Sequence, residues 1–345
     1  MATQTGAVDA PPRADRRPTI DDVARAAGVS RGTVSRVLNG GHWVSPDSLA
    51  AVNAAIRKTG YRINPHARSL ATARAGSVAF LLTESQNRLF EDPNFAVLMR
   101  GAASALAEHD ISLVMLLAGT EAEQRRATNF ITGGHVDGVL MISSHASHKQ
   151  LLTDLVQARV PAISIGVPLG FERKIGHISS QDRSGSADAV AYLQSKGRKR
   201  IATIAGPQDT GGGIFRLAGY KEQIGDVDPA LIGEGDYTFD SGAEATRKLL
   251  DAAPDLDAIF AANDLMAAGA IQTLTERGRR VPEDVSVVGF DDSSVALATT
   301  PRLTTMRQPF DRVSREVVRL LLEVIEGQAP ASMSLPLELV VRESA

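Results

Sequence analysis

The chain has 345 residues, of which 43% are hydrophobic and 4% aromatic, so it can form two or three domains with aliphatic cores. It contains no cysteine, which excludes disulfides, thiolate nucleophiles and cysteine-ligated zinc, and no apolar run approaches the roughly 18 residues of a membrane span. Residues 1–76 contain 11 Lys and Arg against five Asp, a formal charge of +6, and because the whole chain carries −3, the other 269 residues carry −9. A basic first segment on an acidic remainder indicates a nucleic-acid-binding head.

The first 17 residues are rich in Pro, Ala and Arg and lack the apolar stretch of a signal peptide. Such a composition buries too little apolar surface to order itself, which predicts a disordered tail over residues 1–17. Without a signal peptide or a membrane span, we expect the protein to be cytoplasmic.

Residues 19–38 have the pattern of two short helices joined by a tight turn. An apolar stripe at helical spacing runs through residues 20–27, Thr19 can cap its start, and Gly28 can end it because glycine adopts positive φ freely. Ser30 can cap a second helix that runs to about Leu38. Two such helices predict a helix-turn-helix, whose second helix enters the major groove of DNA.

A third helix is predicted over residues 45–60, with Ser45 as its cap and Pro46 at its first position. Its apolar residues can close a small core with those of the first two helices. We therefore expect a DNA-binding domain over residues 18–62, with a helical bundle that binds no DNA as the alternative.

The second helix of this motif presents basic and small polar side chains. Arg31 and Arg36 can each bond both O6 and N7 of a guanine, and contact with phosphate alone is the alternative for both. Gly32 has no side chain, so the helix can approach DNA closely, and hydroxyl or amide groups can donate to phosphates, which position the protein. The predicted DNA contacts of the head are Thr19, Ser30, Arg31, Gly32, Thr33, Ser35, Arg36 and Asn39.

Residues 63–75 are too polar for a core and too favourable to helix for a plain linker. Asn64 can cap a helix of about two turns in which Pro65 suits the first position, but a helix this short is marginal on its own. This hinge should fold only when something packs on it. Its predicted DNA contacts are Asn64, Ala67 and Leu70, with Leu70 wedged between base steps in the minor groove; packing of Leu70 on the head is the alternative.

Residues 76–345 alternate apolar runs of strand length with segments of helical periodicity. A first series predicts four strands and three helices between residues 76 and 166, and a second series of the same kind follows between residues 186 and 292. Repeated βα units imply parallel sheets buried on both faces, and their number implies two α/β subdomains. The late segment 303–327 can cross back to the first subdomain.

Polar and aromatic side chains follow the predicted strands of both series, where ligands of α/β sheets bind. Carboxylates, amides and an arginine among aromatics suit a sugar, because hydroxyls need polar partners and the apolar ring face packs on an aromatic ring. Core packing of Phe95 and Phe239, turn capping by Asp291 and a bystander role for His145 are alternatives. The predicted effector-binding residues are Glu84, Phe90, Phe95, Ser143, His145, Arg216, Tyr237, Phe239, Asn263 and Asp291.

Enzyme signatures are absent from the chain. It lacks HExxH, GxSxG and Walker motifs, and no Lys-Ser/Thr follows the three glycines at 211–213. We therefore expect no catalytic residues, no cofactor and no metal site.

The stretch TIDDVARAAGVSRGTVSRVLNG, followed by VSP, GY and NPHARSLA, resembles the head and hinge of LacI/GalR-type transcriptional repressors. The resemblance extends from residue 18 to about residue 343. It implies a small all-α helix-turn-helix DNA-binding head and an α/β body of two parallel-sheet subdomains, similar to periplasmic sugar-binding proteins. In such repressors, positions that match Arg216, Asn263 and Asp291 line the effector cleft, position 237 is usually aromatic, and the leucine that matches Leu70 enters the centre of a palindromic operator.

The segments LFEDPNF, AGPQDTGGG, DYTFDSG and ANDLMAAGA are most similar to the branch of this family that responds to plant-derived oligosaccharides such as cellobiose. Two departures fall near the expected ligand: Gly166-Val167-Pro168 replaces a common Gly-Arg-Pro, and Gln181-Asp182 replaces a common Asp-Asn. The resemblance also implies a homodimer in which residues 76–345 bind the effector and dimerise.

From these observations we expect a repressor of carbohydrate-utilisation genes that a sugar or oligosaccharide inducer releases from operator DNA. Three alternatives stay open: a repressor with a purine-like corepressor, a solute-binding protein, and a sugar-processing enzyme fused to a DNA-binding head.

Overall fold

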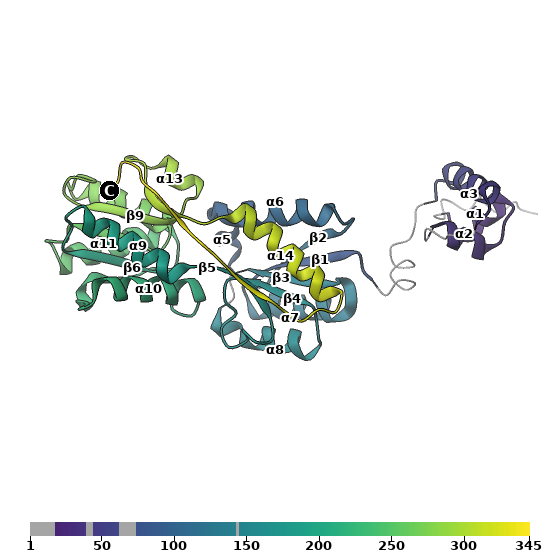
Figure 1. The fold of residues 1–345 in the computed structure, drawn as a ribbon, viewed down its shortest axis with the longest axis horizontal. Coiled ribbons are helices and arrows are strands. Elements are labelled where there is room, and N and C mark those ends of the chain that lie inside the picture. Colours follow the sequence, from purple (N-terminus) through teal and green to yellow (C-terminus); the bar gives the residue numbers. More distant parts are fainter. Residues whose placement is uncertain (1–17, 39–43, 62–73, 143–144) are drawn as a thin grey trace, which may run out of the picture. The chain divides into compact units, whose positions relative to one another are not determined.

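The computed structural model divides after Arg74 into two compact units, a head and a body (Figure 1). It describes residues 18–38, 44–61, 74–142 and 145–345. The tail expected over residues 1–17, and all but the last two residues of the hinge expected over residues 63–75, lie outside this part of the chain.

Three helices form the described part of the head, and short-range chemistry sets their ends. They are α1 (Ile20–Ala27), α2 (Arg31–Leu38) and α3 (Pro46–Thr59). The Asp22 carboxylate accepts hydrogen bonds from the main-chain N–H and the hydroxyl of Thr19, at 2.9 and 2.7 Å, and Gly28 ends α1 at a φ of 68°. The predicted helix-turn-helix and its third helix are confirmed.

The core of the head is small. Its buried side chains pack where the three helices face one another, and they are Val23, Ala24, Val34, Val52 and Ala55. Most other residues of the helices are partly or fully exposed, which leaves α2 free to present polar groups to a partner.

Two six-stranded sheets form the framework of the body. The strands are β1 (Ser77–Leu82), β2 (Ser112–Leu117), β3 (Gly138–Ile142), β4 (Ala162–Ile165), β5 (Gly176–Ser180), β6 (Ile201–Ala205), β7 (Ile232–Glu234), β8 (Ala258–Ala261), β9 (Ser286–Asp291), β10 (Thr304–Arg307), β11 (Ser332–Leu335) and β12 (Glu338–Val340). The first sheet has the order β11-β5-β4-β3-β1-β2 and the second β12-β10-β9-β8-β6-β7. The strand pairs are parallel except for β10 with β12, which confirms the two predicted parallel-sheet subdomains.

Helices cover both faces of each sheet. They are α5 (Gln86–Glu91), α6 (Pro93–Ala107), α7 (Glu121–Phe130), α8 (Lys149–Gln157), α9 (Asp182–Ser195), α10 (Gly211–Ile224), α11 (Phe239–Ala252), α12 (Asp264–Glu276), α13 (Ser294–Ala298) and α14 (Phe310–Ile325), with short helical turns η1 (Ile131–His135), η2 (Ala146–His148) and η3 (Pro229–Leu231). On the first sheet α6 and α14 lie opposite α7 and α8, and on the second sheet α9 and α10 lie opposite α11 and α12.

Strand β1 shows why these sheets need two helical layers. Val78, Phe80 and Leu82 point to the side of α6 and α14, whereas Ala79 and Leu81 point to the side of α7 and α8. Because successive side chains alternate between the faces, a continuously apolar strand is stable only when both faces are covered.

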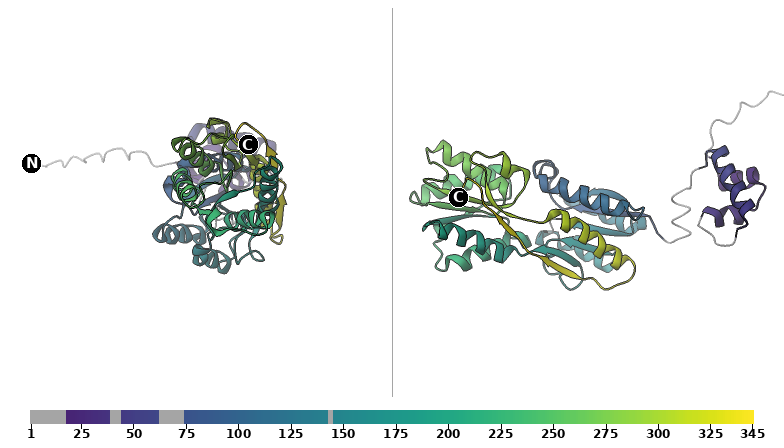
Figure 2. Two further views of the ribbon diagram at one scale, coloured as in Figure 1. Left: turned by 90° about the vertical axis from the view of Figure 1, so that its left-hand side faces the viewer. Right: turned by 45° about the horizontal axis from the view of Figure 1, so that its top comes forward.

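The chain passes three times between the two subdomains of the body. It crosses from β5 to α9, returns from β10 to α14, and crosses again from β11 to β12. Figure 2 shows the two lobes, with the yellow C-terminal segment running along both. We call the lobe of the first sheet, which includes α14, the N-subdomain and the lobe of the second sheet the C-subdomain. The predicted return of segment 303–327 to the first lobe is confirmed through α14, which packs on α6.

Several short elements were not predicted. Strand β5 has the sequence GHISS and strand β7 has three residues, so neither forms an apolar run of recognisable length.

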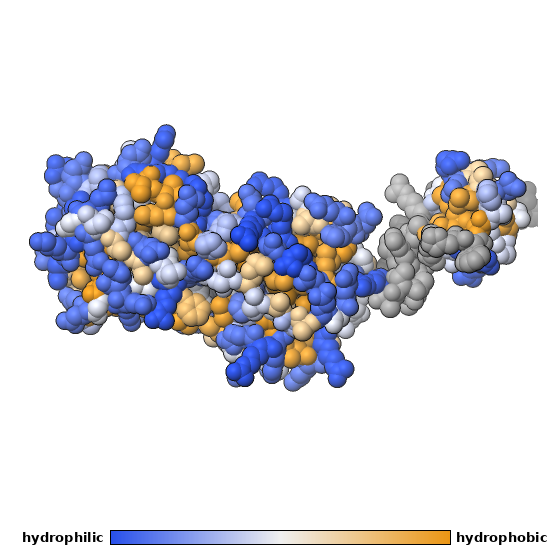
Figure 3. Space-filling view, in the orientation of Figure 1, coloured by the Kyte–Doolittle hydropathy of each residue, from blue (hydrophilic) through white to orange (hydrophobic). Residues whose placement is uncertain are grey.

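Hydrophilic residues dominate the visible face of the body, and apolar residues gather over the region of α13, where Leu297 is exposed (Figure 3). In the described ranges, no helix is both long and apolar enough to cross a membrane.

Candidate functional site

Helix α2 presents the polar surface of the head. Arg31, Gly32 and Arg36 are exposed, and the Arg31 side chain, 72% exposed, lies 3.9 Å from the Asp21 carboxylate. Ser30 begins the helix, because its hydroxyl accepts a hydrogen bond from the N–H of Thr33 at 3.1 Å. Both arginines can therefore reach a partner without breaking buried contacts.

The remaining predicted DNA contacts divide into two groups. Thr19, Thr33 and Ser35 are partly buried, and Thr19 and Thr33 already take part in the bonds that cap α1 and α2. Asn39, Asn64, Ala67 and Leu70 lie outside the described residues.

A cavity of about 160 Å³ lies between the two subdomains of the body, at the carboxyl ends of their strands. The N-subdomain contributes apolar side chains to much of its wall, namely Phe95, Leu98, Ile142, Ile165, Ile178, Phe310 and Val313. The C-subdomain contributes mainly polar groups, namely Asp182, Thr210, Arg216, Tyr237, Asn263 and Asp291.

Arg216 on α10 organises the polar wall. Its Nε donates to Asp182 at 2.8 Å, and its Nη1 donates to the carbonyl oxygen of Ala262 at 2.6 Å and to Asp291 at 3.4 Å. The guanidinium also lies 3.8 Å from the centre of the Phe290 ring. Burial alone would lower the pKa of Arg216, but Asp182 and Asp291 raise it, so the group stays charged.

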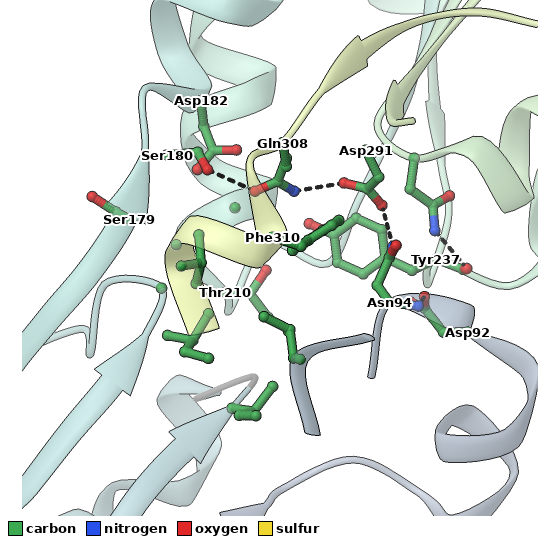
Figure 4. Close-up of a pocket in the computed structure, with 18 of the residues that line it drawn as sticks. Asp92, Asn94, Ser179, Ser180, Asp182, Thr210, Tyr237, Asp291, Gln308 and Phe310 are labelled. Carbon is green, nitrogen blue, oxygen red and sulfur yellow. Dashed lines mark hydrogen bonds between the residues drawn. The ribbon is translucent and has the colours of Figure 1, made fainter. Parts of the chain in front are cut away.

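Asp291 ends strand β9 with a φ of 112° and accepts hydrogen bonds from both subdomains. One oxygen accepts from Nδ2 of Asn94 at 2.9 Å, and the other accepts from Nε2 of Gln308 at 2.6 Å. Ser180 in turn donates to Gln308 at 2.6 Å, so a chain of polar contacts crosses the cleft (Figure 4). Burial raises the pKa of Asp291 to about 7, against the opposing effect of Arg216.

Tyr237 lies where the polar and apolar walls meet. Its backbone has a φ of 70°, and its carbonyl oxygen accepts hydrogen bonds from Arg88 at 2.8 Å and Asn263 at 2.9 Å. A Cβ at Gly206 would lie 2.4 Å from the ring, so the ring needs glycine at that position. Asn263 also caps α12, since its side-chain oxygen accepts from the N–H of Met266.

Arg88 is the buried cation of the opposite subdomain. Its Nη2 lies 3.4 Å from Asp92 and its Nε 3.9 Å from Glu84, and its guanidinium lies 5.8 Å from the Phe95 ring and 5.6 Å from the Tyr237 ring. Because Arg88 belongs to the N-subdomain and Tyr237 to the C-subdomain, this contact links the two lobes beside the cavity.

The structure brings together six of the ten residues predicted to bind an effector. Glu84, Phe95, Arg216, Tyr237, Asn263 and Asp291 line the cavity. Three others lie elsewhere: Phe90 is 84% exposed on α5, Phe239 is partly buried at the start of α11, and His145 lies outside the lining. Ser143 lies outside the described residues.

Several polar residues that line the cavity were not predicted, among them Arg88, Asn94 and Gln308. Arg88 lies on the short helix α5 after β1, Asn94 lies in the first turn of α6, and Gln308 lies on the second crossing. The sequence predicted the crossing itself, so the polar residue within it, Gln308, is the signal that could have placed this side chain at the cleft. Within the described ranges, no group of three or more His, Asp or Glu could hold a metal ion.

Comparisons with known families match both units. The description "Bacterial regulatory proteins, lacI family" matches residues 19–64, and "Periplasmic binding protein-like domain" matches residues 190–345. The HTH-type transcriptional regulator CelR of Thermobifida fusca is 44% identical, over 95% of this chain and 98% of its own length. The HTH-type transcriptional repressor CytR of Escherichia coli K12 is 31% identical, over 94% of this chain and 96% of its own length.

Two solved structures share the fold over nearly the whole chain. A transcriptional regulator CelR–cellobiose complex is 42% identical with a TM-score of 0.77, covering 95% of this chain and 100% of that one. A lac repressor dimer bound to operator and the anti-inducer ONPF is 29% identical with a TM-score of 0.83, covering 95% and 99%. The similarity therefore includes the head, the body and the order in which they follow each other.

Proposed function

This chain belongs to the lacI family of bacterial regulatory proteins, and we propose that it is a repressor that an oligosaccharide such as cellobiose releases from operator DNA. It is a DNA-binding regulator of transcription, like the relatives that match it from head to body. The relatives are named as a transcriptional regulator and a transcriptional repressor.

The proposal for the ligand rests on the difference between the two walls of the cleft. Arg216, Asp291 and Asn263 offer fixed donors and acceptors at one wall, while Phe95 and its apolar neighbours form much of the other, beside polar groups such as Arg88 and Asn94. A sugar has hydroxyls at its edges and an apolar face, so it can use both walls at once. This chain is 42% identical in sequence to a regulator whose structure was solved with cellobiose, so this disaccharide is the first ligand to test.

The proposed route of the signal runs from the cleft to the hinge. Two protomers place two heads on a palindromic operator, with Leu70 of each hinge between base steps. A ligand that favours one angle between the subdomains changes the spacing of the two hinges, and it weakens operator binding if the favoured angle separates them.

A ligand screen tests the effector class. The full-length protein is mixed with cellobiose, longer cello-oligosaccharides, other sugars and purines, and the thermal unfolding midpoint is measured. We expect a rise with cello-oligosaccharides that is lost in Arg216→Met. A rise with purines alone would overturn the carbohydrate proposal in favour of a purine-like corepressor, and turnover of a bound sugar would indicate an enzyme.

A further inference from the structure

A second cluster of charged side chains lies at the cleft: Glu84 lines the cavity, whereas His145 and Asp209 lie outside its lining. His145 follows strand β3 of the N-subdomain, Glu84 follows β1 of the same subdomain, and Asp209 precedes α10 of the C-subdomain. Nδ1 of His145 lies 3.1 Å from both carboxylate oxygens of Asp209, and its Nε2 lies 3.1 Å from Oε1 of Glu84.

The backbone holds the same two loops together. The N–H of Ala146 donates to the carbonyl oxygen of Asp209 at 2.8 Å, and His145 forms an isolated antiparallel bridge with Thr210. The side-chain cluster therefore lies on a direct connection between the two subdomains, and not on a chance approach of long side chains.

The protonation state follows from the contacts. A neutral imidazole has one N–H, so it can donate to one carboxylate and leaves its other nitrogen facing a second one. An imidazolium donates to both. We propose that His145 is a proton-linked latch, which holds the N- and C-subdomains together when the imidazole is doubly protonated.

The surrounding charges favour this state. The groups that face His145 are Glu84, Asp209 and His148, whose ring centre lies 5.3 Å away, with Arg88 behind Glu84. Burial alone would lower the pKa of His145, but the hydrogen bonds and charges of Glu84 and Asp209 outweigh burial and raise it. Burial and the nearby His145 lower the pKa of His148, so this second ring does not compete for the proton.

Opening the cleft removes only one of the two carboxylates. Glu84 shares a subdomain with His145 and stays beside it, whereas Asp209 leaves with the C-subdomain. The pKa of His145 is therefore higher in the closed form, and closure takes up a proton. This contribution to closure is complete below the pKa of the open form and is lost as the pH rises through the pKa of the closed form.

A consequence for regulation rests on the proposed function. If the effector binds to the closed form, its binding takes up a proton at His145, and its affinity falls as the pH rises from 6 to 8. The latch therefore makes the effector sensitivity of the protein depend on pH through His145, a residue that does not line the cavity.

The first test compares variants in calorimetric titrations with cellobiose at pH 6, 7 and 8, in buffers of different ionisation enthalpy. Relative to His145→Gln, the wild type should lose about threefold or more in affinity between pH 6 and pH 8 and should take up protons on binding. Asp291 is common to both proteins, so its own titration cancels in this comparison. His148→Gln is the matched control and should behave like the wild type.

A second test needs no ligand, so it separates the latch from the proposed effector. The imidazole of His145 is titrated by NMR in the full-length protein and in Asp209→Asn. We expect the pKa to fall in Asp209→Asn, and an unchanged pKa would overturn the latch. Identical pH dependence of cellobiose binding in wild type and His145→Gln would also overturn it, whereas absence of cellobiose binding in every variant would count against the effector proposal alone.

Discussion

The recognition surface of the head and the polar wall of the cleft use arginine in opposite ways. The side chain of Arg31 on α2 is 72% exposed with one acidic neighbour at 3.9 Å, whereas that of Arg216 on α10 is 9% exposed and contacts two carboxylates, a carbonyl oxygen and an aromatic ring. Arg31 is therefore available to a charged partner outside the protein, whereas the charge of Arg216 is already balanced by carboxylates of the protein itself.

This difference has an energetic meaning. An exposed charge adds little to the free energy of unfolding, so it can be exchanged without harm to the fold and is available to a phosphate or a base. A buried charge needs its partners, so we expect the cleft to bind a neutral polar ligand by offering pre-arranged hydrogen bonds and not net charge. The two regions should therefore respond differently to matched substitutions.

Arg216→Met should have the largest effect. It leaves Asp182 and Asp291 buried without their cation, and we expect a loss of about 3–5 kcal/mol in the free energy of unfolding together with loss of effector binding. Urea unfolding and calorimetric titration measure the two effects. Arg183→Met is the matched control, because Arg183 forms an exposed pair with Glu222 and should cost less than about 1 kcal/mol. Equal losses in the free energy of unfolding of both variants would show that the buried and the exposed arginine do not differ in this way.

Arg31→Ala and Arg36→Ala should weaken operator binding by about 1–3 kcal/mol if each arginine bonds a guanine. The free energy of unfolding and the sugar affinity should stay unchanged. Fluorescence anisotropy with a selected operator measures the effect, and Arg125→Ala in the body is the matched control, since its side chain is 70% exposed and pairs with Glu121. If a substitution weakens binding to operator and to random DNA equally, that arginine contacts phosphate and not a base.

Leu70→Ala tests the hinge prediction, which lies outside the described residues. Removal of the apolar wedge should weaken specific operator binding by about tenfold, with effector affinity nearly intact. The same anisotropy titration measures it, and an unchanged operator affinity would exclude the wedge.

Asp291→Asn should change how stability depends on pH. Burial raises the pKa of Asp291 from 3.8 to about 7, so this carboxyl stabilises the fold below its unfolded pKa and loses that contribution as the pH rises towards 7. The asparagine variant should lack this decline, a difference of up to about 1.4 kcal/mol per pH unit between pH 4 and 7. Urea unfolding of both proteins across this range measures it, and parallel curves would contradict the raised pKa.

The sequence was most informative where short-range chemistry decides the structure. Thr19, Gly28 and Pro46 set helix ends by capping and backbone preference alone, so the head could be predicted helix by helix. In the cleft, Arg216, Asn263 and Asp291 could be located because the carboxyl ends of parallel strands meet at one edge.

Long-range packing decided the rest. Arg88 and Asn94 reach the cavity only because α5 and α6 fold back over β1, and Gln308 reaches it because the chain recrosses between lobes. Phe90 shows the converse, since it follows the same strand as Phe95 yet points into solvent. Strand-end position therefore indicates the neighbourhood of a site, and tertiary packing selects the side chains that enter it.

Operator release by cellobiose is the decisive measurement for the proposed repressor. An operator selected from random DNA is titrated with the full-length protein in the absence and presence of saturating cellobiose, with Arg216→Met beside it. We expect cellobiose to weaken operator binding of the wild type by at least about tenfold and to leave binding by Arg216→Met unchanged. Operator affinity that cellobiose leaves the same, or strengthens, would contradict it.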